Sequence, residues 1–260
     1  GLVRAWGYDG YASERVRRKI RDEANLVLTN PDMLHRGILP YHTKWHRLLR
    51  RLDFVVTDEV HSYRGIFGSN VGNVLRRLRR VAAHYGGAPR FLCSSATIRN
   101  PRELCETLVG LPFTLVEDDG SPRGPKTFVL WNPPYLDNAQ MERRSGNVEA
   151  KELLVRLVEH GVHTIVFTKA RVVTELIYKY AREDLLHRRG GLAEKLRPYR
   201  GGYLPAERRE IERQLFSGEL LGVVATNALE LGIDIGGLDA AVLVGFPGTV
   251  ASIWQQAGRA

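Results

Sequence analysis

The stretch from Leu52 to His61 most constrains the fold of this chain, because it is an apolar run that ends in two adjacent acids. Residues 54–56 are aromatic or β-branched with no interrupting charge, which predicts a strand buried on both faces of a parallel sheet. A sheet of that kind binds its ligands just beyond the carboxyl ends of its strands. Asp58 and Glu59 stand at that point and are expected to lie in a binding site.

Two neighbouring carboxylates repel each other and are costly to remove from water, so a bound cation would account for Asp58 and Glu59. One acid can hold Mg²⁺ through water while the other orients or deprotonates an attacking water. A plainer alternative is a solvated Asp-Glu turn after a core strand. A second enzyme alternative is a metal hydrolase built on Asp58, Glu59 and His61, which would need further ligands that the sequence does not place.

Short apolar segments alternate with amphipathic segments through both halves of the chain, which predicts an α/β fold with parallel sheets and right-handed crossovers. The expected strands are residues 3–8, 26–28, 54–56, 91–94, 127–131, 164–167, 222–225 and 240–244. The expected helices are residues 13–23, a segment from 31, 71–82, 101–109, 148–160, 171–186, 205–216 and a last helix containing 255–260. Residues 62–68 are expected to form a glycine-punctuated loop.

An acidic and then Gly/Pro-rich run at residues 118–125 is the best linker in the chain, and it predicts two domains at 1–122 and 123–260. The formal net charge of +9 and the pI near 9.8 favour a polyanionic partner such as nucleic acid. Four arginines share the polar face of one expected helix, either as a nucleic-acid patch or, as we favour, as a solvated outer face: Arg76, Arg77, Arg79 and Arg80.

The cysteine count and the ends of the chain bear on its location. Cys93 and Cys105 cannot make a zinc site alone and do not suggest a disulfide framework, so a reducing, cytoplasmic location is expected. No apolar run approaches the ~18 to 20 residues that span a bilayer. The start lacks a signal peptide and an initiator methionine, and we expect the chain to be part of a longer protein.

Polar motifs follow several of the expected strands. Thr29, Asn30 and Asp32 combine a hydroxyl, an amide and a helix that starts at Pro31, and such a group can grip a phosphate. A capped helix start is the plainer interpretation of the same residues. The tripeptide Ser95-Ala96-Thr97 follows another strand, and its two hydroxyls could bridge the acidic strand to a moving part.

Six motifs occur in order along the chain, each at a strand end or a helix start: Thr29 to Asp32, Asp58 to His61, Ser95 to Thr97, Ile165 to Phe167 with Arg171, Thr226 to Asp234, and Gln255 to Arg259. Together they resemble the motif series of superfamily 2 helicases over essentially the whole chain. Their finer wording is similar to that of the YprA-like DEAD/DEAH-box DNA helicases, also called mitomycin repair factors. The resemblance implies two tandem RecA-like domains, the first truncated at its N-terminus.

The resemblance also implies an activity and its ligands. It implies an ATP-dependent DNA helicase that couples ATP hydrolysis to movement along single-stranded DNA, from 3′ to 5′ and in DNA repair. ATP and Mg²⁺ would be its ligands, and single-stranded DNA would be its partner through backbone contacts. No other small-molecule substrate and no membrane are expected.

Individual residues receive roles from the same resemblance. Asp58 would hold Mg²⁺ through water, and Glu59 would orient and activate the attacking water. Asp234 would approach the ribose, and Arg259 would reach the γ-phosphate. Coupling within the enzyme would fall to His61, Gln255, Ser95 and Thr97, and contacts with the single strand to Thr29, Asn30, Asp32, Arg171 and Thr226.

The sequence departs from the family pattern at the phosphate loop. No Gly-x-x-x-x-Gly-Lys-[Ser/Thr] motif occurs, and the near match at residues 120–127 fails because Pro125 removes an N–H and the segment lies between domains. The family's loop would lie upstream of Thr29, and its last motif and four-cysteine zinc module would continue beyond Ala260. We therefore expect these residues alone to be inactive. The alternative function is a nucleic-acid-binding helicase fragment without ATPase activity.

Overall fold

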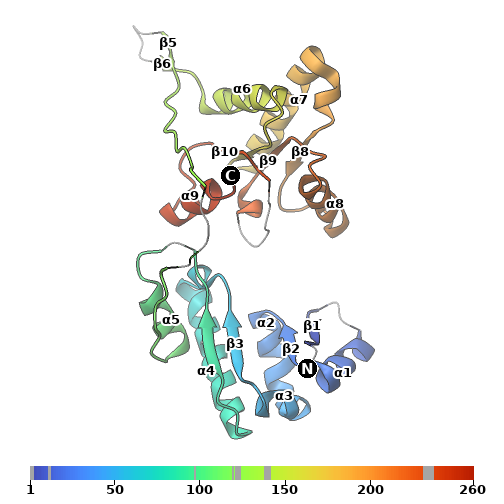
Figure 1. Cartoon of the computed structure of the whole chain (residues 1–260), viewed down its shortest axis with the longest axis vertical. Coiled ribbons are helices and arrows are strands. Elements are labelled where there is room, and N and C mark those ends of the chain that lie inside the picture. Colours follow the sequence, from blue (N-terminus) through green and yellow to red (C-terminus); the bar gives the residue numbers. More distant parts are fainter. Residues whose placement is uncertain are drawn as a thin grey trace. The chain divides into compact units, whose positions relative to one another are not determined.

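The computed structural model describes residues 3–10, 13–96, 98–118, 120, 124–137, 142–230 and 237–260. The chain divides into two compact units, Gly1–Pro122 and Arg123–Ala260. Each unit combines helices with parallel strands, so the predicted α/β class with parallel sheets is confirmed. Figure 1 shows the elements of each unit along the chain. Among the described residues, none of the helices combines the length and the apolar composition that a membrane span requires.

The first unit combines short strands with helices of very different length, of which the helix at Gly65–His84 is the longest. Its strands are β1 (Ala5–Gly7), β2 (Leu26–Leu28), β3 (Phe54–Thr57) and β4 (Arg90–Cys93). Its α-helices are α1 (Glu14–Glu23), α2 (Pro31–Met33), α3 (His46–Arg50), α4 (Gly65–His84) and α5 (Pro101–Val109). A π-helical segment η1 (Leu34–Ile38) and two 3₁₀ segments, η2 (Leu39–Trp45) and η3 (Val60–Ser62), complete it.

The strands of the first unit pair in parallel, β1 with β2 and β3 with β4. The predicted burial of β3 on both faces is wrong, because Phe54 and Val56 are 54% and 68% exposed. Val55 instead packs into the core beneath the helices, while the described residues leave the opposite face of the strand open. A purely apolar run therefore identified the strand but overestimated how much of it is covered.

Helix α4 begins at Gly65, so the predicted loop at residues 62–68 is wrong over its second half. The glycine that suggested a loop serves close packing instead. A Cβ atom built on Gly68 would lie 2.2 Å from the carbonyl oxygen of Tyr63, which no side chain tolerates. The start of α4 can therefore fold back against the preceding segment only with glycine at this position.

Two of the four arginines on α4 have a structural role that neither sequence interpretation anticipated. Arg76 donates to the carbonyl oxygen of Thr107 at 2.6 Å, and Arg79 donates to those of Val109 and Gly110 at 2.9 and 3.0 Å. These carbonyls lie at the end of α5, where the last turn of a helix leaves its acceptors unsatisfied. The arginines therefore cap α5 and join it to α4.

The second unit contains the elements that follow the linker. Its strands are β5 (Tyr135–Asp137), β6 (Glu142–Arg143), β7 (Thr164–Phe167), β8 (Leu196–Tyr199), β9 (Gly222–Ala225) and β10 (Ala240–Leu243). Its helices are α6 (Gly146–Glu159), α7 (Arg171–Ala193), α8 (Pro205–Phe216), α9 (Val250–Ala257) and the 3₁₀ turn η4 (Asn227–Leu229).

Four of these strands form one parallel sheet in the order β10-β7-β9-β8. Alternate residues of β7 point into two different cores, since Val166 packs with α6 and α7 whereas Ile165 and Phe167 pack with residues of α8. This sheet is therefore buried on both faces, as expected for parallel strands between helices. Its carboxyl ends gather the loops that follow β7, β9 and β10 (Figure 1).

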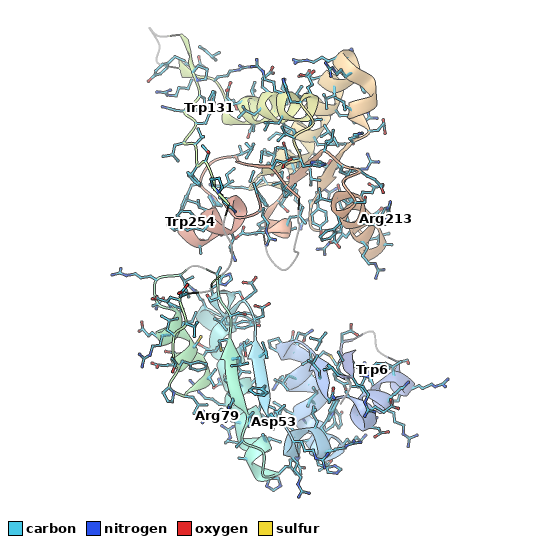
Figure 2. All side chains as sticks on the ribbon, viewed as in Figure 1. Trp6, Asp53, Arg79, Trp131, Arg213 and Trp254 are labelled. Atoms are coloured by element: carbon cyan, nitrogen blue, oxygen red, sulfur yellow. The ribbon has the colours of Figure 1, made fainter. Side chains whose placement is uncertain are left out.

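The predicted strand at residues 127–131 is wrong, since that segment pairs with no strand of the described residues. Its aromatic side chains attach separately to two helices. The Phe128 ring lies 6.1 Å from that of Trp254 on α9, and the Trp131 indole donates to Glu149 of α6 at 3.0 Å. Figure 2 labels both tryptophans in the second unit. The β-forming composition of this segment reflects anchoring contacts and no sheet pairing.

Candidate functional site

Asp58 stands directly after β3, and the neighbouring strand holds its carboxylate. The parallel register places Thr57 opposite Cys93, which brings Asp58 beside Ser94. Its Oδ1 atom accepts a hydrogen bond from the Ser94 hydroxyl and another from the Glu59 backbone N–H at 2.9 Å. The exposed carboxylate is therefore fixed by both strand ends, and the predicted site lies at the carboxyl edge of the β3–β4 pair.

Glu59 adopts a left-handed backbone conformation, with φ 52° and ψ 41°. It is the one non-glycine residue with positive φ among the described residues. This conformation costs a non-glycine residue roughly 1–2 kcal/mol, so the surrounding contacts must maintain it. Val60 is fully buried in the next position, and Ser62 donates to the Glu59 carbonyl through its hydroxyl and its N–H at 2.7 and 2.9 Å.

His61 lies between the acidic pair and the segment after β4. Its Nδ1 atom is 3.2 Å from Glu59 Oε2 and also 3.2 Å from the backbone nitrogen of Ala96. The Ala96 N–H can only donate, so this bond requires Nδ1 to accept, whereas a bond to Glu59 requires a proton on Nδ1. One imidazole can satisfy one of these two partners at a time. Nδ1 of His61 can therefore switch its hydrogen bond between the Glu59 carboxylate and the Ala96 N–H, in the segment that contains Ser95.

Burial and neighbouring groups raise the pKa of two side chains close to the acidic pair, Tyr63 and Cys93. The pKa of Tyr63 is raised by burial and then by the charges of Asp58 and Glu59. Burial first, and then the neighbouring Cys105, raise the pKa of Cys93 to about 12. Cys93 is therefore a protonated thiol at neutral pH and is unsuited to act as a nucleophile.

The donor set around Asp58 fits Mg²⁺ and does not fit a metal cage made by protein alone. Among the described residues, no three His, Cys, Asp or Glu side chains are arranged to hold a metal ion. Within the same residues, Oδ2 of Asp58 accepts no hydrogen bond, because both donors use Oδ1. Mg²⁺ is typically held by one or two carboxylates together with waters and phosphate oxygens. The metal-hydrolase alternative therefore lacks its ligands in the described part of the chain.

The first polar motif lies at the end of β2 and is a capped helix start. Thr29 donates through its hydroxyl to the Tyr8 carbonyl at 2.9 Å, and Asn30 Oδ1 accepts from the Met33 N–H at 2.8 Å. Thr29, Asn30 and Asp32 are all exposed. Their side chains thus order the turn and remain open to solvent at the same time.

The remaining predicted residues of the first unit give less information. Ser95 is exposed, and its hydroxyl donates to the Ala96 carbonyl at 2.8 Å. Thr97 lies outside the described residues, and so does Asp234 in the second unit.

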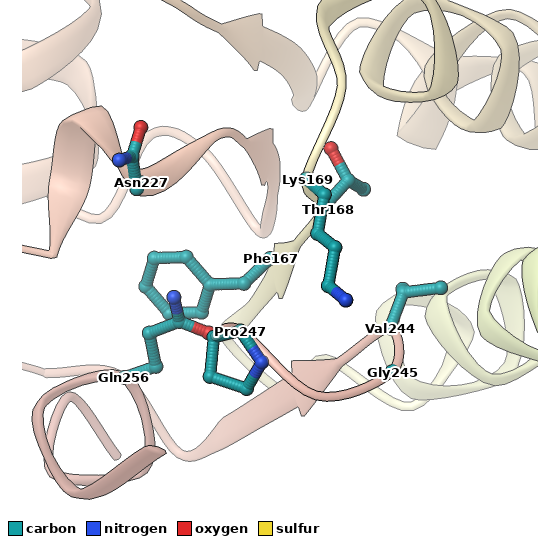
Figure 3. Close-up of a pocket in the computed structure, with 8 residues that line it drawn as sticks. All are labelled: Phe167, Thr168, Lys169, Asn227, Val244, Gly245, Pro247 and Gln256. Carbon is teal, nitrogen blue, oxygen red and sulfur yellow. The ribbon is translucent and has the colours of Figure 1, made fainter. Parts of the chain in front are cut away.

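The second unit contains a cavity of about 230 Å³ at the carboxyl edge of its sheet. Figure 3 shows its lining side chains, which come from the end of β7, from the loops after β7 and β10, from η4 and from α9. The lining residues are Phe167, Thr168, Lys169, Asn227, Val244, Gly245, Pro247 and Gln256. Polar and apolar side chains both line this hollow, which lies where parallel sheets usually bind ligands.

Arg171 and Thr226 lie near this edge and differ in exposure. Arg171 is exposed at the first turn of α7, and its guanidinium lies 3.4 Å from the place where a Cβ atom of Gly201 would be. Thr226 is 7% exposed, and its hydroxyl caps η4 by accepting from the Ala228 N–H at 3.5 Å. Arg171 can therefore meet a partner directly, whereas Thr226 mainly shapes the turn that presents Asn227.

The end of α9 is tied to the segment after β9 through Glu230. The amide of Gln256 donates to Glu230 Oε2 at 2.8 Å, and the guanidinium of Arg259 donates to the Glu230 carbonyl oxygen. Gln255 is half-buried on the same helix. The structure thus brings together two motifs that are about 30 residues apart, with Arg259 held inside the second unit.

Sequence reasoning missed three residues that the structure brings into these sites: Ser94, Glu230 and Gln256. Ser94 could have been found from the parallel register, which puts it opposite Asp58 once the two strands are paired. Glu230 could have been flagged as a lone carboxylate between Leu229 and Leu231. The pairing of Glu230 with Gln256 leaves no local signal, because it depends on how α9 returns to the sheet.

Comparisons with known proteins agree with this geometry. A DEAD/DEAH box helicase model matches residues 1–104, and a helicase conserved C-terminal domain model matches residues 149–260. The chain is 52% identical over 258 residues to the ATP-dependent helicase YprA of Bacillus subtilis (strain 168), a match that covers 99% of this chain and 34% of that protein.

Solved structures give the same result. The crystal structure of the DUF1998 helicase MrfA bound to DNA and AMPPNP matches with a TM-score of 0.93 and 52% identity, over 99% of this chain and 36% of that one. The Mycobacterium smegmatis helicase Lhr bound to ssDNA and AMP-PNP matches with a TM-score of 0.77 and 29% identity, over 100% of this chain and 33% of that one. The chain thus spans about a third of the length of these relatives.

Two helicase models follow one another along the chain, as do two α/β units with parallel strands. The predicted resemblance to the superfamily 2 helicases is therefore confirmed, and so is the finer resemblance to the YprA-like branch. This chain belongs to the superfamily 2 DEAD/DEAH-box helicases, as a tandem of RecA-like domains close to YprA and MrfA.

Proposed function

We propose that the protein containing this chain is an ATP-dependent DNA helicase that couples ATP hydrolysis to movement along single-stranded DNA. The observation that carries the proposal is the acidic pair, with Asp58 fixed by Ser94 and Glu59 held in a left-handed conformation beside His61. A costly backbone conformation at one charged residue indicates a position selected for chemistry rather than for stability. The solved relatives that bind DNA together with AMPPNP support the same reaction.

The first unit supplies the groups that act on water. Bound Mg²⁺–ATP would provide the phosphoryl group. Its metal would neutralise the negative charge that develops on the phosphate oxygens. Asp58 would hold the metal through water, and Glu59 would orient the attacking water and take up its proton. Through its hydrogen bonds, His61 couples Glu59 to Ser95 and Thr97. These two residues link hydrolysis to the approach of the two domains.

The second unit supplies the groups that complete the nucleotide site. Arg259 stabilises charge on the γ-phosphate, a role worth about 10³–10⁵ in kcat for arginine fingers. Gln255 couples this site to the facing domain, and Asp234 contacts the ribose.

The DNA strand follows the carboxyl edges of the strands in both units. Thr29, Asn30 and Asp32 contact its backbone from the first unit, and Arg171 and Thr226 do so from the second. Hydroxyls, amides and helix starts suit phosphate contacts that are independent of sequence. The exposure of Thr29, Asn30 and Arg171 supports this track. Movement from 3′ to 5′, a role in DNA repair and a cytoplasmic location are the finer parts of the proposal.

A second candidate is a nucleic-acid-binding helicase fragment without ATPase activity. The absence of a Gly-x-x-x-x-Gly-Lys-[Ser/Thr] motif from the 260 residues favours it for the chain on its own. ATP hydrolysis measured with and without single-stranded DNA, in the 260-residue chain and in a protein of the relatives' full length, separates the two. The proposal predicts DNA-stimulated hydrolysis in the long protein and none in the short chain. A long protein that binds DNA without hydrolysing ATP would contradict it.

A further inference from the structure

We infer that Glu230 is a positioning residue that joins the DNA-facing segment after β9 to Arg259 at the end of α9. This inference rests on the proposed function. Glu230 lies within the motif from Thr226 to Asp234, but the sequence analysis assigned no contact to it. Three contacts of Glu230 carry it, one through its side chain and two through its backbone.

The side-chain contact is a buried hydrogen bond between a carboxylate and an amide. Glu230 is 8% exposed and Gln256 is 4% exposed. Within the described residues, the Gln256 amide is the one hydrogen-bond donor to the Glu230 carboxylate, at 2.8 Å. A buried carboxylate is costly to desolvate and is normally retained only where a hydrogen bond compensates. The pair therefore fixes the position of α9 relative to the segment after β9.

The backbone contacts extend this link in both directions. The Glu230 N–H donates to the Asn227 carbonyl at 3.0 Å, in the turn that Thr226 caps. The Glu230 carbonyl accepts from the Arg259 guanidinium. A displacement of the Thr226 turn is thus passed through one residue to both Gln256 and Arg259.

Arg259 is also tied to Gln256 directly, since its backbone N–H donates to the Gln256 carbonyl at 3.2 Å. The Glu230–Gln256 bond therefore sets the position of the Arg259 backbone, and the Glu230 carbonyl sets the resting place of its guanidinium. Arg259 has to leave that carbonyl before it can serve another partner. We expect DNA bound along the second unit to influence this release through Glu230.

The test exchanges the amide and the carboxylate of the Glu230–Gln256 pair. Gln256→Glu places two carboxylates together in a buried site and breaks the link, whereas Glu230→Gln combined with Gln256→Glu restores an amide and a carboxylate in exchanged positions. Gln256→Leu removes the hydrogen bond without adding charge, in case Gln256→Glu does not fold. Glu149→Gln is the matched control, because Glu149 is a buried carboxylate of the same unit that contacts Trp131 and Arg144 instead.

Two measurements are made on the protein of the relatives' full length. The first is kcat for ATP hydrolysis with and without an oligothymidylate strand. The second needs no nucleotide: ¹⁹F NMR of fluorotryptophan-labelled protein, with the Trp254 signal on α9 assigned by Trp254→Phe, follows α9 as the oligothymidylate is added. Melting temperature is recorded for every variant.

The inference predicts that Gln256→Glu and Gln256→Leu lose about 10-fold or more of the DNA-stimulated kcat, with KM for ATP changed less than about 3-fold. The DNA-induced shift of Trp254 disappears in both variants and returns in the exchanged pair, together with kcat. Glu149→Gln keeps both properties at a lowered melting temperature. Retained stimulation and a retained Trp254 shift in Gln256→Leu would overturn the inference alone. A parent protein without DNA-stimulated hydrolysis would overturn the proposed function and this inference together.

Discussion

At the scale of single residues, Asp58 depends on a hydroxyl from the neighbouring strand. Because Ser94 engages Oδ1 together with the Glu59 N–H, the carboxylate is held in one orientation before any ligand arrives. Ser94→Ala removes one of these two donors and leaves the charge in place. We expect KM for Mg²⁺–ATP to rise about 10-fold or more with a smaller change in kcat, since a hydrogen bond to a charged group contributes about 1.5–3 kcal/mol. Steady-state kinetics on Ser94→Ala in the full-length protein check this, and an unchanged KM would contradict it.

The left-handed conformation of Glu59 can be tested by a pair of substitutions that differ in one methyl group. Glu59→Gly and Glu59→Ala both remove the carboxylate. The difference between their free energies of unfolding therefore reports the cost of the backbone conformation. Glycine should be more stable than alanine here by about 1 kcal/mol, because the left-handed region costs alanine roughly 1–2 kcal/mol and glycine almost nothing. Urea unfolding of the two variants gives the difference in free energy of unfolding.

The same exchange at an ordinary helical position supplies the control. At Arg80, on the exposed side of α4, glycine should be less stable than alanine by up to about 1 kcal/mol. If glycine is also the less stable residue at Glu59, the backbone strain inferred there does not exist.

At the scale of elements, the joint between α4 and α5 depends on two arginines. Arg79 donates to two carbonyls at the end of α5, so Arg79→Ala leaves both acceptors without their partner. We expect the free energy of unfolding to fall by about 1–3 kcal/mol. Arg80→Ala is the control, and as an exposed substitution it should stay within about 0.5 kcal/mol of the parent. Equal effects of the two substitutions would contradict a capping role for Arg79.

Elements with strong local signals could be predicted closely from the sequence. Pro101 at the first turn and Gly110 with φ 74° bound α5 at the predicted residues, and α8 and β9 also occur where the pattern placed them. Helix caps and glycine turns act over a few residues, so a short window contains their cause. The strand predicted at residues 127–131 is wrong because the composition of the segment suits a strand. Its aromatic side chains instead contact two helices further along the chain.

Sites formed by contacts between distant segments could be predicted only in part. The position of Asp58 and Glu59 followed from strand order, since parallel strands end at one edge. The bond between Glu230 and Gln256 joins residues 26 positions apart and depends on the packing of α9, which no local pattern specifies. The exposure of Phe54 and Val56 likewise depends on which parts of the molecule cover β3.

At the scale of the whole molecule, the formal charge of +9 predicts how DNA binding responds to salt. Each phosphate neutralised on a single strand contributes about 0.7 to the slope of log affinity against log salt concentration. We expect the 260-residue chain to bind oligothymidylate and mixed-sequence strands alike, with affinity falling steeply as salt rises. Fluorescence anisotropy titrations over a salt series measure the slope. A salt-independent affinity, or a strong preference for one sequence, would contradict backbone recognition.

The acidic pair after β3 is proposed to be the catalytic centre, and the substitution Glu59→Gln provides the sharpest test of that role. The substitution keeps size and hydrogen-bonding capacity but removes the group that acts on water in the transition state. In a protein of the relatives' full length, single-turnover ATP hydrolysis with DNA present should fall by about 10²–10⁴-fold, while ATP still binds. Asp58→Asn should impair binding as well as hydrolysis. Normal hydrolysis by Glu59→Gln would show that the acidic pair is not the catalytic centre.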